Sequence, residues 1–136
     1  MNILVMDAQG GGIGKQVITA IKKNFPGQPV TAVGINSAAT SAMLKAGAAQ
    51  GATGENAVAY NAARADLILG PVGVILANGI LGEVSPAMAA AVSGAGAVKI
   101  LIPSASCGVY VAGGEGRRLE DYLRQAVDLA LRELEA

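Results

Sequence analysis

A run of glycines near the start of the chain carries the clearest chemical signal. It follows a short apolar segment and reads Asp7-Ala8-Gln9-Gly10-Gly11-Gly12-Ile13-Gly14-Lys15. Glycine lets backbone N–H groups approach a ligand with no Cβ in the way, and the N-terminus of a following helix adds partial positive charge. We therefore expect this glycine loop, residues 10–14, to bind a phosphate or another anion, with Lys15 as counter-charge.

The residues flanking the loop, Asp7, Gln9 and Ile13, belong to the same candidate binding site. Asp7 could cap the glycine amides, bind a ribose hydroxyl or hold a magnesium ion. Its charge would repel a phosphate placed too near. An alternative interpretation is that the glycines only form a tight turn and let the helix pack closely.

Asn36 and Ser37 are the second part of the candidate site, because they follow the second expected strand. In dinucleotide-binding domains an acidic residue at this position holds the ribose hydroxyls. Asn36 weakens the case for NAD, although both side chains could bond a 2′-phosphate or an adenine edge. Helix capping is the simpler alternative. The cofactor is therefore undetermined, with NAD(P) or another nucleotide possible.

The hydrophobic pattern indicates the elements that must position these residues. Strands are expected at residues 2–6, 29–35, 67–69 and 97–102, and helices at 13–25, 38–46, 53–64, 86–93 and 119–134. Alternating strands and helices predict an α/β fold with one open, mostly parallel sheet and helices on both faces. We expect a single Rossmann-like domain over residues 1–136.

A fifth strand is expected near residues 109–112, where Val109, Tyr110 and Val111 follow one another. Only residues 103–107 separate it from the preceding strand, and a parallel crossover needs about a dozen residues or more. The sequence therefore predicts an antiparallel strand at the edge of the sheet.

The composition excludes several classes of protein. Hydrophobic residues make up 52% of the 136 residues and charged residues 15%, which is unlike a disordered chain. Ten basic residues balance ten acidic ones, which argues against a nucleic-acid partner. With one cysteine and no histidine, we expect no disulfide within the chain, no metal site and a cytoplasmic location. The uncharged segment 67–82 is interrupted by glycines and too short to span a membrane, so we expect no membrane partner.

Other polar residues are weaker candidates for a functional site. Asn78 and Glu83 interrupt an apolar stretch, and Glu83 is the only charge between residues 67 and 98. That stretch predicts a buried interface in a homo-oligomer, with a dimer favoured. Cys107 has no histidine to activate it. A further set could form the other wall of the site or simply cap helices: Thr40, Ser41, Lys45, Thr53, Glu55 and Asn56.

Two known loops resemble part of the glycine run. Gly12-Ile13-Gly14 resembles the end of the GxxxGxG turn of short-chain dehydrogenases, but Tyr60 is followed by Arg64 where that family's catalytic motif has lysine. The segment 11–15 also resembles the core of a P-loop, in which Gln16 replaces the hydroxyl residue that would hold magnesium.

Over its whole length the sequence resembles a small bacterial family known only as a domain of unknown function. The resemblance implies a compact, cytoplasmic Rossmann-like protein and carries no catalytic residues with it. It rests on four segments: the glycine run, Asn36-Ser37-x-x-Thr40-Ser41-Ala42-Met43-Leu44-Lys45-Ala46-Gly47-Ala48, Gly51-Ala52-Thr53-Gly54-Glu55-Asn56 and Gly70-Pro71-x-Gly73.

Three functional hypotheses remain open. The first is a binding protein for a nucleotide or phosphometabolite that uses the glycine loop. The second is a small NAD(P)-dependent oxidoreductase, for which Tyr60, Tyr110 or Lys45 would have to lie near the nicotinamide. The third is a structural or assembly protein without a small ligand. The sequence assigns no catalytic residue and does not decide whether the protein is an enzyme.

Overall fold

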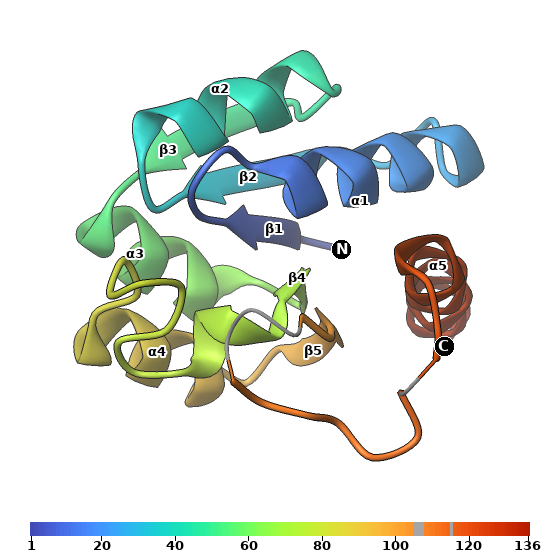
Figure 1. The fold of residues 1–136 in the computed structure, drawn as a ribbon. Helices are drawn as coiled ribbons and strands as arrows, with labels where there is room; N and C mark the ends of the chain where they lie inside the picture. The colour runs from blue at the N-terminus through green and yellow to red at the C-terminus, as the bar shows by residue number, and fades with distance from the viewer. Residues whose placement is uncertain (105–107, 115) are drawn as a thin grey trace.

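The computed structural model describes residues 1–104, 108–114 and 116–136, and its centre is one five-stranded sheet (Figure 1). The strands are β1 (Ile3–Asp7), β2 (Val30–Gly34), β3 (Gln50–Thr53), β4 (Leu67–Pro71) and β5 (Val98–Ile102). All pairings are parallel, in the order β3-β2-β1-β4-β5. The predicted open α/β sheet of Rossmann type is confirmed.

Helices cover both faces of the sheet. They are α1 (Gly12–Asn24), α2 (Ser37–Lys45), α3 (Glu55–Arg64), α4 (Pro86–Ser93) and α5 (Leu119–Glu135), with a short 3₁₀ turn, η1 (Val72–Ile75). Buried side chains of α1, α2 and α5 share one apolar cluster with the sheet, and those of α3 and α4 share another. Figure 1 shows α1 and α2 on one side of the strands and α3 and α4 on the other.

The central strand β1 fixes where a ligand could bind. All five of its residues are buried, as expected of a parallel strand covered on both faces. The chain places β2 on one side of β1 and β4 on the other, so the strand order reverses at the carboxyl end of β1. In open parallel sheets ligands bind in the crevice at such a switch point. The glycine loop begins at this point.

The structure corrects the prediction of an antiparallel edge strand near residues 109–112. Within the described residues, no strand lies in this segment, and every strand of the sheet is parallel. Tyr110 is 92% exposed, so the apolar run Val109-Tyr110-Val111 does not pack into the sheet. The strand that the sequence did not predict is β3 (Gln50–Thr53), whose last residue, Thr53, was expected to begin a helix.

Two expected helix caps are also displaced by one residue. The side chain of Asn36, not that of Ser37, accepts the backbone N–H of Ala39 and caps α2. Gly54, not Thr53, precedes α3. The helix expected at residues 86–93 is confirmed as α4, with Pro86 as its first residue and Ser85 Oγ accepting the N–H of Met88 as its N-cap.

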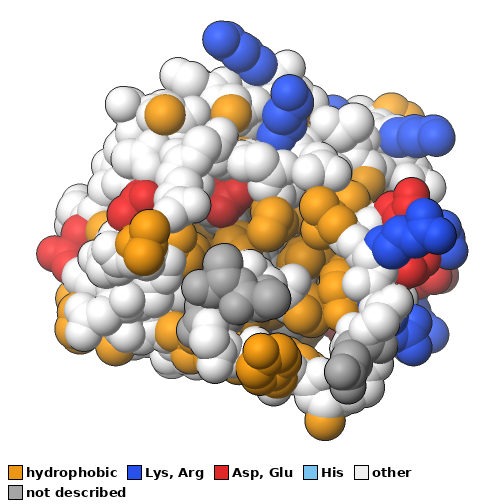
Figure 2. All heavy atoms as spheres, in the orientation of Figure 1, with side chains coloured by type: hydrophobic (Ala, Val, Ile, Leu, Met, Phe, Trp, Pro, Cys, Tyr) orange, Lys and Arg blue, Asp and Glu red, His pale blue; other side chains and the backbone are white. Residues whose placement is uncertain are grey.

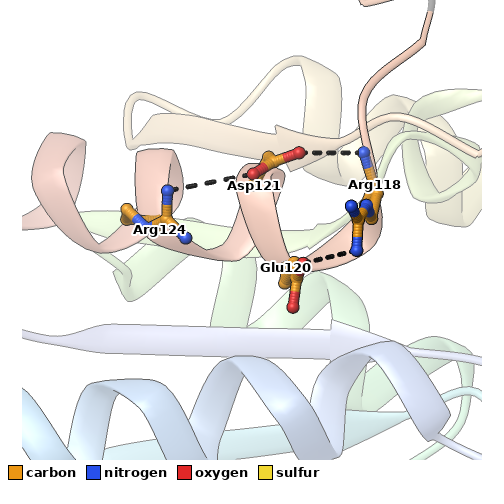
Figure 3. A network of polar contacts seen from close by, with 4 residues as sticks. All are labelled: Arg118, Glu120, Asp121 and Arg124. Carbon is orange, nitrogen blue, oxygen red and sulfur yellow. Dashed lines mark hydrogen bonds and ion pairs between the residues drawn. The ribbon is translucent and has the colours of Figure 1, made fainter.

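Charged residues organise the start of α5 (Figure 3). The Asp121 carboxylate accepts the backbone N–H of Arg118 at 3.1 Å and lies 3.8 Å from the Arg124 guanidinium. Arg118 also pairs with Glu120 at 3.4 Å. Such exposed pairs contribute little to stability, so the apolar side of α5 holds it on the sheet. In the part of the chain that the structure describes, no helix has the length and apolar character needed to cross a membrane.

Candidate functional site

Asp7 organises the glycine loop from the end of β1. Its carboxylate is buried and accepts the backbone N–H groups of Ala8 and Gly14, both at 2.7 Å. Burial raises the pKa of Asp7, the bonded amides of Gly14, Ala8 and Ile13 lower it in part, and the nearby charge of Glu83 raises it further. Of the three roles that the sequence left open for Asp7, the structure shows the capping role.

Two glycines of the loop are required by packing. Gly11 has a φ of +73°, and a Cβ there would lie 2.9 Å from the carbonyl oxygen of Ala39. A Cβ on Gly14 would lie 2.6 Å from the sulfur of Met43 and 2.9 Å from Cβ of Asp7. Close packing of α1 against β1 and α2 therefore explains these two glycines.

Packing does not explain Gly10 and Gly12. Neither has a positive φ, and a Cβ on either would meet nothing within 4 Å. Both residues are exposed, and among the described residues no protein acceptor receives the N–H of Gly10 or Gly12. The amide of Gly12 belongs to the first turn of α1, where helices leave donors without an intrahelical partner. These two amides are available to a ligand.

Gln9, the residue before the glycine loop, binds a second carboxylate, that of Glu83. Both carboxylate oxygens accept the backbone N–H of Gln9, at 3.1 and 3.2 Å, and Oε2 also accepts Asn36 Nδ2 at 2.8 Å. Asn36 thereby caps α2 with its oxygen and holds Glu83 with its nitrogen. Sequence reasoning singled out Glu83 as the lone charge of an apolar stretch but did not connect it with Gln9 and Asn36.

A compact loop between η1 and α4 presents Glu83 to the glycine loop. Asn78, Ile80 and Leu81 have φ values of 61°, 53° and 54°, a region that β-branched residues such as Ile80 rarely adopt. Two hydrogen bonds close the loop, from the Asn78 N–H to the Val84 carbonyl at 2.7 Å and from the Val84 N–H to the Gly79 carbonyl at 3.2 Å. We call residues 76–84 the β4–α4 loop. Asn78 serves here as a turn residue.

The remaining predicted site residues lie near the carboxyl ends of the central strands. Lys15 is exposed in the first turns of α1, and Gln9 is exposed with a φ of 47°. Ile13 is partly buried and packs against the core cluster, and Ser37 is exposed as the first residue of α2. The structure thus gathers the predicted residues at the carboxyl ends of β1 and β2.

Most of the weaker candidates have structural roles. Thr40 Oγ1 lies 2.7 Å from Thr53 Oγ1 and joins α2 to β3. Glu55 accepts the hydroxyl of Ser85 and joins α3 to the start of α4. Ser41 and Asn56 are exposed on α2 and α3. Cys107 lies outside the described residues.

The residues considered for nicotinamide chemistry are not brought together. Tyr60 lies over the Arg64 guanidinium and lines a hollow with Asn2 and Gln50, at the amino ends of the strands. Lys45 ends α2, and the chain returns from there to the start of β3. Both lie toward the amino ends of the strands, away from the glycine loop. Tyr110, the third residue considered, is exposed and lines the hollow that follows β5.

An apolar hollow opens at the carboxyl end of β5. It has a volume of about 800 Å³, and Figure 2 shows hydrophobic side chains gathered in a hollow on this face. Its lining includes Pro103, Tyr110, Val111, Leu119, Tyr122 and one cation, Arg117. β5 lies two strands from β1, so its end is about 10 Å from that of β1 along the sheet edge. The hollow and the glycine loop therefore both lie at the carboxyl-terminal end of the sheet.

Comparisons with known proteins identify a family and a fold. The model of the family DUF3842, described as a domain of unknown function, matches residues 2–135. No curated protein sequence matches the chain. A similar solved structure is a dodecameric FMN-dependent UbiX-like decarboxylase from Escherichia coli O157:H7, with a TM-score of 0.53, 14% identity, and coverage of 100% of this chain and 95% of that one. At this identity the likeness concerns the fold alone.

Proposed function

This chain belongs to the DUF3842 family, a domain of unknown function, and we propose from its geometry that it binds a small phosphate-bearing ligand, a nucleotide or phosphometabolite, at the glycine loop. The phosphate accepts the N–H groups of Gly10 and Gly12, and Lys15 supplies the counter-charge. The observation that carries the proposal is that the fold requires glycine at positions 11 and 14 but not at positions 10 and 12. A ligand approaching the backbone explains the other two.

Two further observations support a ligand larger than phosphate. The apolar hollow at the end of β5 lies at the same edge of the sheet and can bury an apolar or aromatic group. The solved structure with a similar fold is described as FMN-dependent, and FMN is a phosphate-bearing ligand of this kind. Tyr60 and Lys45 lie away from the glycine loop and give the oxidoreductase hypothesis no support, which leaves only the exposed Tyr110 of the hollow for it.

A thermal-shift screen of the purified protein tests the proposal. The ligands are adenine and guanine nucleotides, NAD, NADP, FMN and coenzyme A, each with and without magnesium. A ligand present at 100 times its Kd stabilises the folded state by about 2.7 kcal/mol, which raises the melting midpoint by several degrees. We expect at least one of these ligands to produce such a shift.

The variant Gly12→Asp separates binding from folding. A carboxylate at the first helical position interacts favourably with the helix N-terminus and unfavourably with the carboxylates of Asp7 and Glu83, so the midpoint without ligand should change little. The same carboxylate occupies and repels the phosphate position, so the ligand-induced shift should disappear. Gly27→Asp is the matched control, because Gly27 also has open space and no positive φ but follows the other end of α1. An undiminished shift in Gly12→Asp would contradict the proposal.

We also propose that the protein forms a homo-oligomer through the surface around the β4–α4 loop. Leu81 at this loop is 94% exposed, and the exposed residues Ala77, Pro86, Ala87 and Ala90 carry no charge. The solved structure with a similar fold is described as dodecameric. An apolar surface of this kind is typical of a contact between proteins.

Sedimentation velocity of Leu81→Asn measures this association. Asparagine tolerates the positive φ at this position, so the fold should be kept while the apolar contact is lost. We expect the wild-type protein to sediment as an oligomer at micromolar concentration and the variant to shift toward the monomer. Leu129→Asn, on the exposed side of α5, serves as the control. A monomeric wild-type protein would end this proposal.

A further inference from the structure

The carboxylate of Glu83 lies beside Asn36, at the end of β2, where many Rossmann-type sites have an acidic residue of their own. In Rossmann-type sites an acid at the end of the second strand binds the ribose hydroxyls, and this chain has Asn36 there. Asn36 Nδ2, however, donates to Glu83 Oε2 at 2.8 Å. The β4–α4 loop thus delivers a carboxylate to the end of β2 from across the switch point.

Glu83 and a second carboxylate lie beside the proposed phosphate site, so this site disfavours phosphate alone. Its oxygens rest on the N–H of Gln9, one residue before the free N–H of Gly10. Asp7 lies close enough for the charge of Glu83 to raise its pKa. Two carboxylates beside an anion site repel phosphate, but carboxylates accept hydrogen bonds from hydroxyl groups. A ligand with hydroxyl groups next to its phosphate offers the phosphate to the free amides and the hydroxyl groups to the carboxylates.

The backbone that presents Glu83 has an unusual conformation, which holds the carboxylate in a fixed place. Three consecutive or nearly consecutive residues with side chains, Asn78, Ile80 and Leu81, adopt positive φ. Such conformations persist only where the surrounding structure fixes them, and they cluster at ligand-binding sites. The hydrogen bonds that close the β4–α4 loop supply this constraint.

We infer that Glu83 is the specificity-determining residue of the site and selects phosphate esters that carry hydroxyl groups near the phosphate, as ribose and polyol phosphates do. Glu83 accepts these hydroxyls while the amides of Gly10 and Gly12 hold the phosphate. Asn36 keeps the carboxylate in place. This inference rests on the proposed function, because it concerns the same site.

A matched pair of ligands tests the inference without presupposing a base. Glycerol 3-phosphate and n-propyl phosphate have the same phosphate and chain length, and only the first carries hydroxyls. Their affinities are measured by titration of the isotope-labelled full chain, followed by NMR. Hydrogen bonds to a charged group are worth about tenfold or more in affinity, so the wild type should bind glycerol 3-phosphate about tenfold more tightly.

Glu83→Gln should reduce that preference to less than about threefold, because the neutral amide accepts hydroxyls more weakly. Glu135→Gln removes the same charge at an exposed position of α5 and should keep the preference. Asn36→Asp retains an oxygen to cap α2 but repels Glu83, so it should also lower the preference.

The outcomes separate this inference from the proposed function. Equal binding of both esters by the wild type, or an unchanged preference in Glu83→Gln, overturns the role of Glu83 and leaves the phosphate site intact. Tighter binding of both esters by the same factor in Glu83→Gln also overturns it, because Glu83 would then only compete with phosphate. Binding of neither ester overturns the inference about Glu83, whereas the proposed function fails only if the nucleotide and cofactor screen also gives no shift.

Discussion

Replacing Gly34 by alanine should destabilise the protein by about 3 kcal/mol or more, because overpacking at this position cannot be relieved by side-chain motion. A Cβ on Gly34 would lie 2.3 Å from Thr40 Oγ1, 2.5 Å from the Thr40 backbone nitrogen and 2.6 Å from the Asn36 carbonyl oxygen. Two of these three atoms are backbone atoms at the start of α2. The whole first turn of the helix would have to move away from β2.

Chemical denaturation compares this variant with a matched glycine. Gly27→Ala adds the same methyl group where a Cβ meets nothing within 4 Å, and it should change the free energy of unfolding by less than about 1 kcal/mol. Gly34→Ala should also weaken ligand binding, since the displaced turn carries Asn36. Equal unfolding midpoints for the two variants would show that β2 and α2 are not packed as described.

Asp7→Ala should lower the free energy of unfolding at neutral pH by about 2 kcal/mol, because buried amide donors lose their acceptor. The amides of Ala8 and Gly14 each donate to this carboxylate at 2.7 Å. The loss is partly offset, because burying the charged carboxylate is itself unfavourable. Urea unfolding at constant pH measures the difference.

The pH dependence of that difference isolates the carboxyl group. Burial raises the pKa of Asp7 above its ordinary value of 3.8, so between 3.8 and the raised pKa the folded state binds more protons than the unfolded state. Asp7 therefore makes the wild type less stable as pH rises through this window. The stability advantage of the wild type over Asp7→Ala should grow as pH falls through the raised pKa and level off below 3.8. A shrinking advantage over the same range would mean that the amides, not burial, dominate the pKa.

The alternation of strands and helices was predictable, and the errors have physical reasons. β3 is an edge strand with the sequence Gln-Gly-Ala-Thr, which is mostly exposed and lacks the apolar pattern that identifies buried strands. The run Val109-Tyr110-Val111 has that pattern but pairs with no strand in the described structure. The local hydrophobic pattern shows only which secondary structure a segment favours. Whether the segment becomes a strand depends on whether another strand is placed to pair with it.

The candidate site was predictable in its local part only. The position of the glycine loop follows from the strand that precedes it and the helix that follows. The bond from the Gln9 amide to Glu83 joins residues 74 positions apart. This bond depends on the conformation of the β4–α4 loop, in which Ile80 and Leu81 adopt positive φ values that residues of these types rarely adopt. The isolated charge of Glu83 was the only sequence signal of this contact.

Assigned amide spectra during a titration with glycerol 3-phosphate test whether the glycine loop binds phosphate, because they report on each backbone N–H separately. We expect the signals of Gly10 and Gly12 to shift most and to saturate together, the signal of Gly27 to stay in place, and Gly12→Asp to abolish the response. Unchanged signals at Gly10 and Gly12, or saturable shifts confined to the hollow at the end of β5, would contradict phosphate binding at this loop.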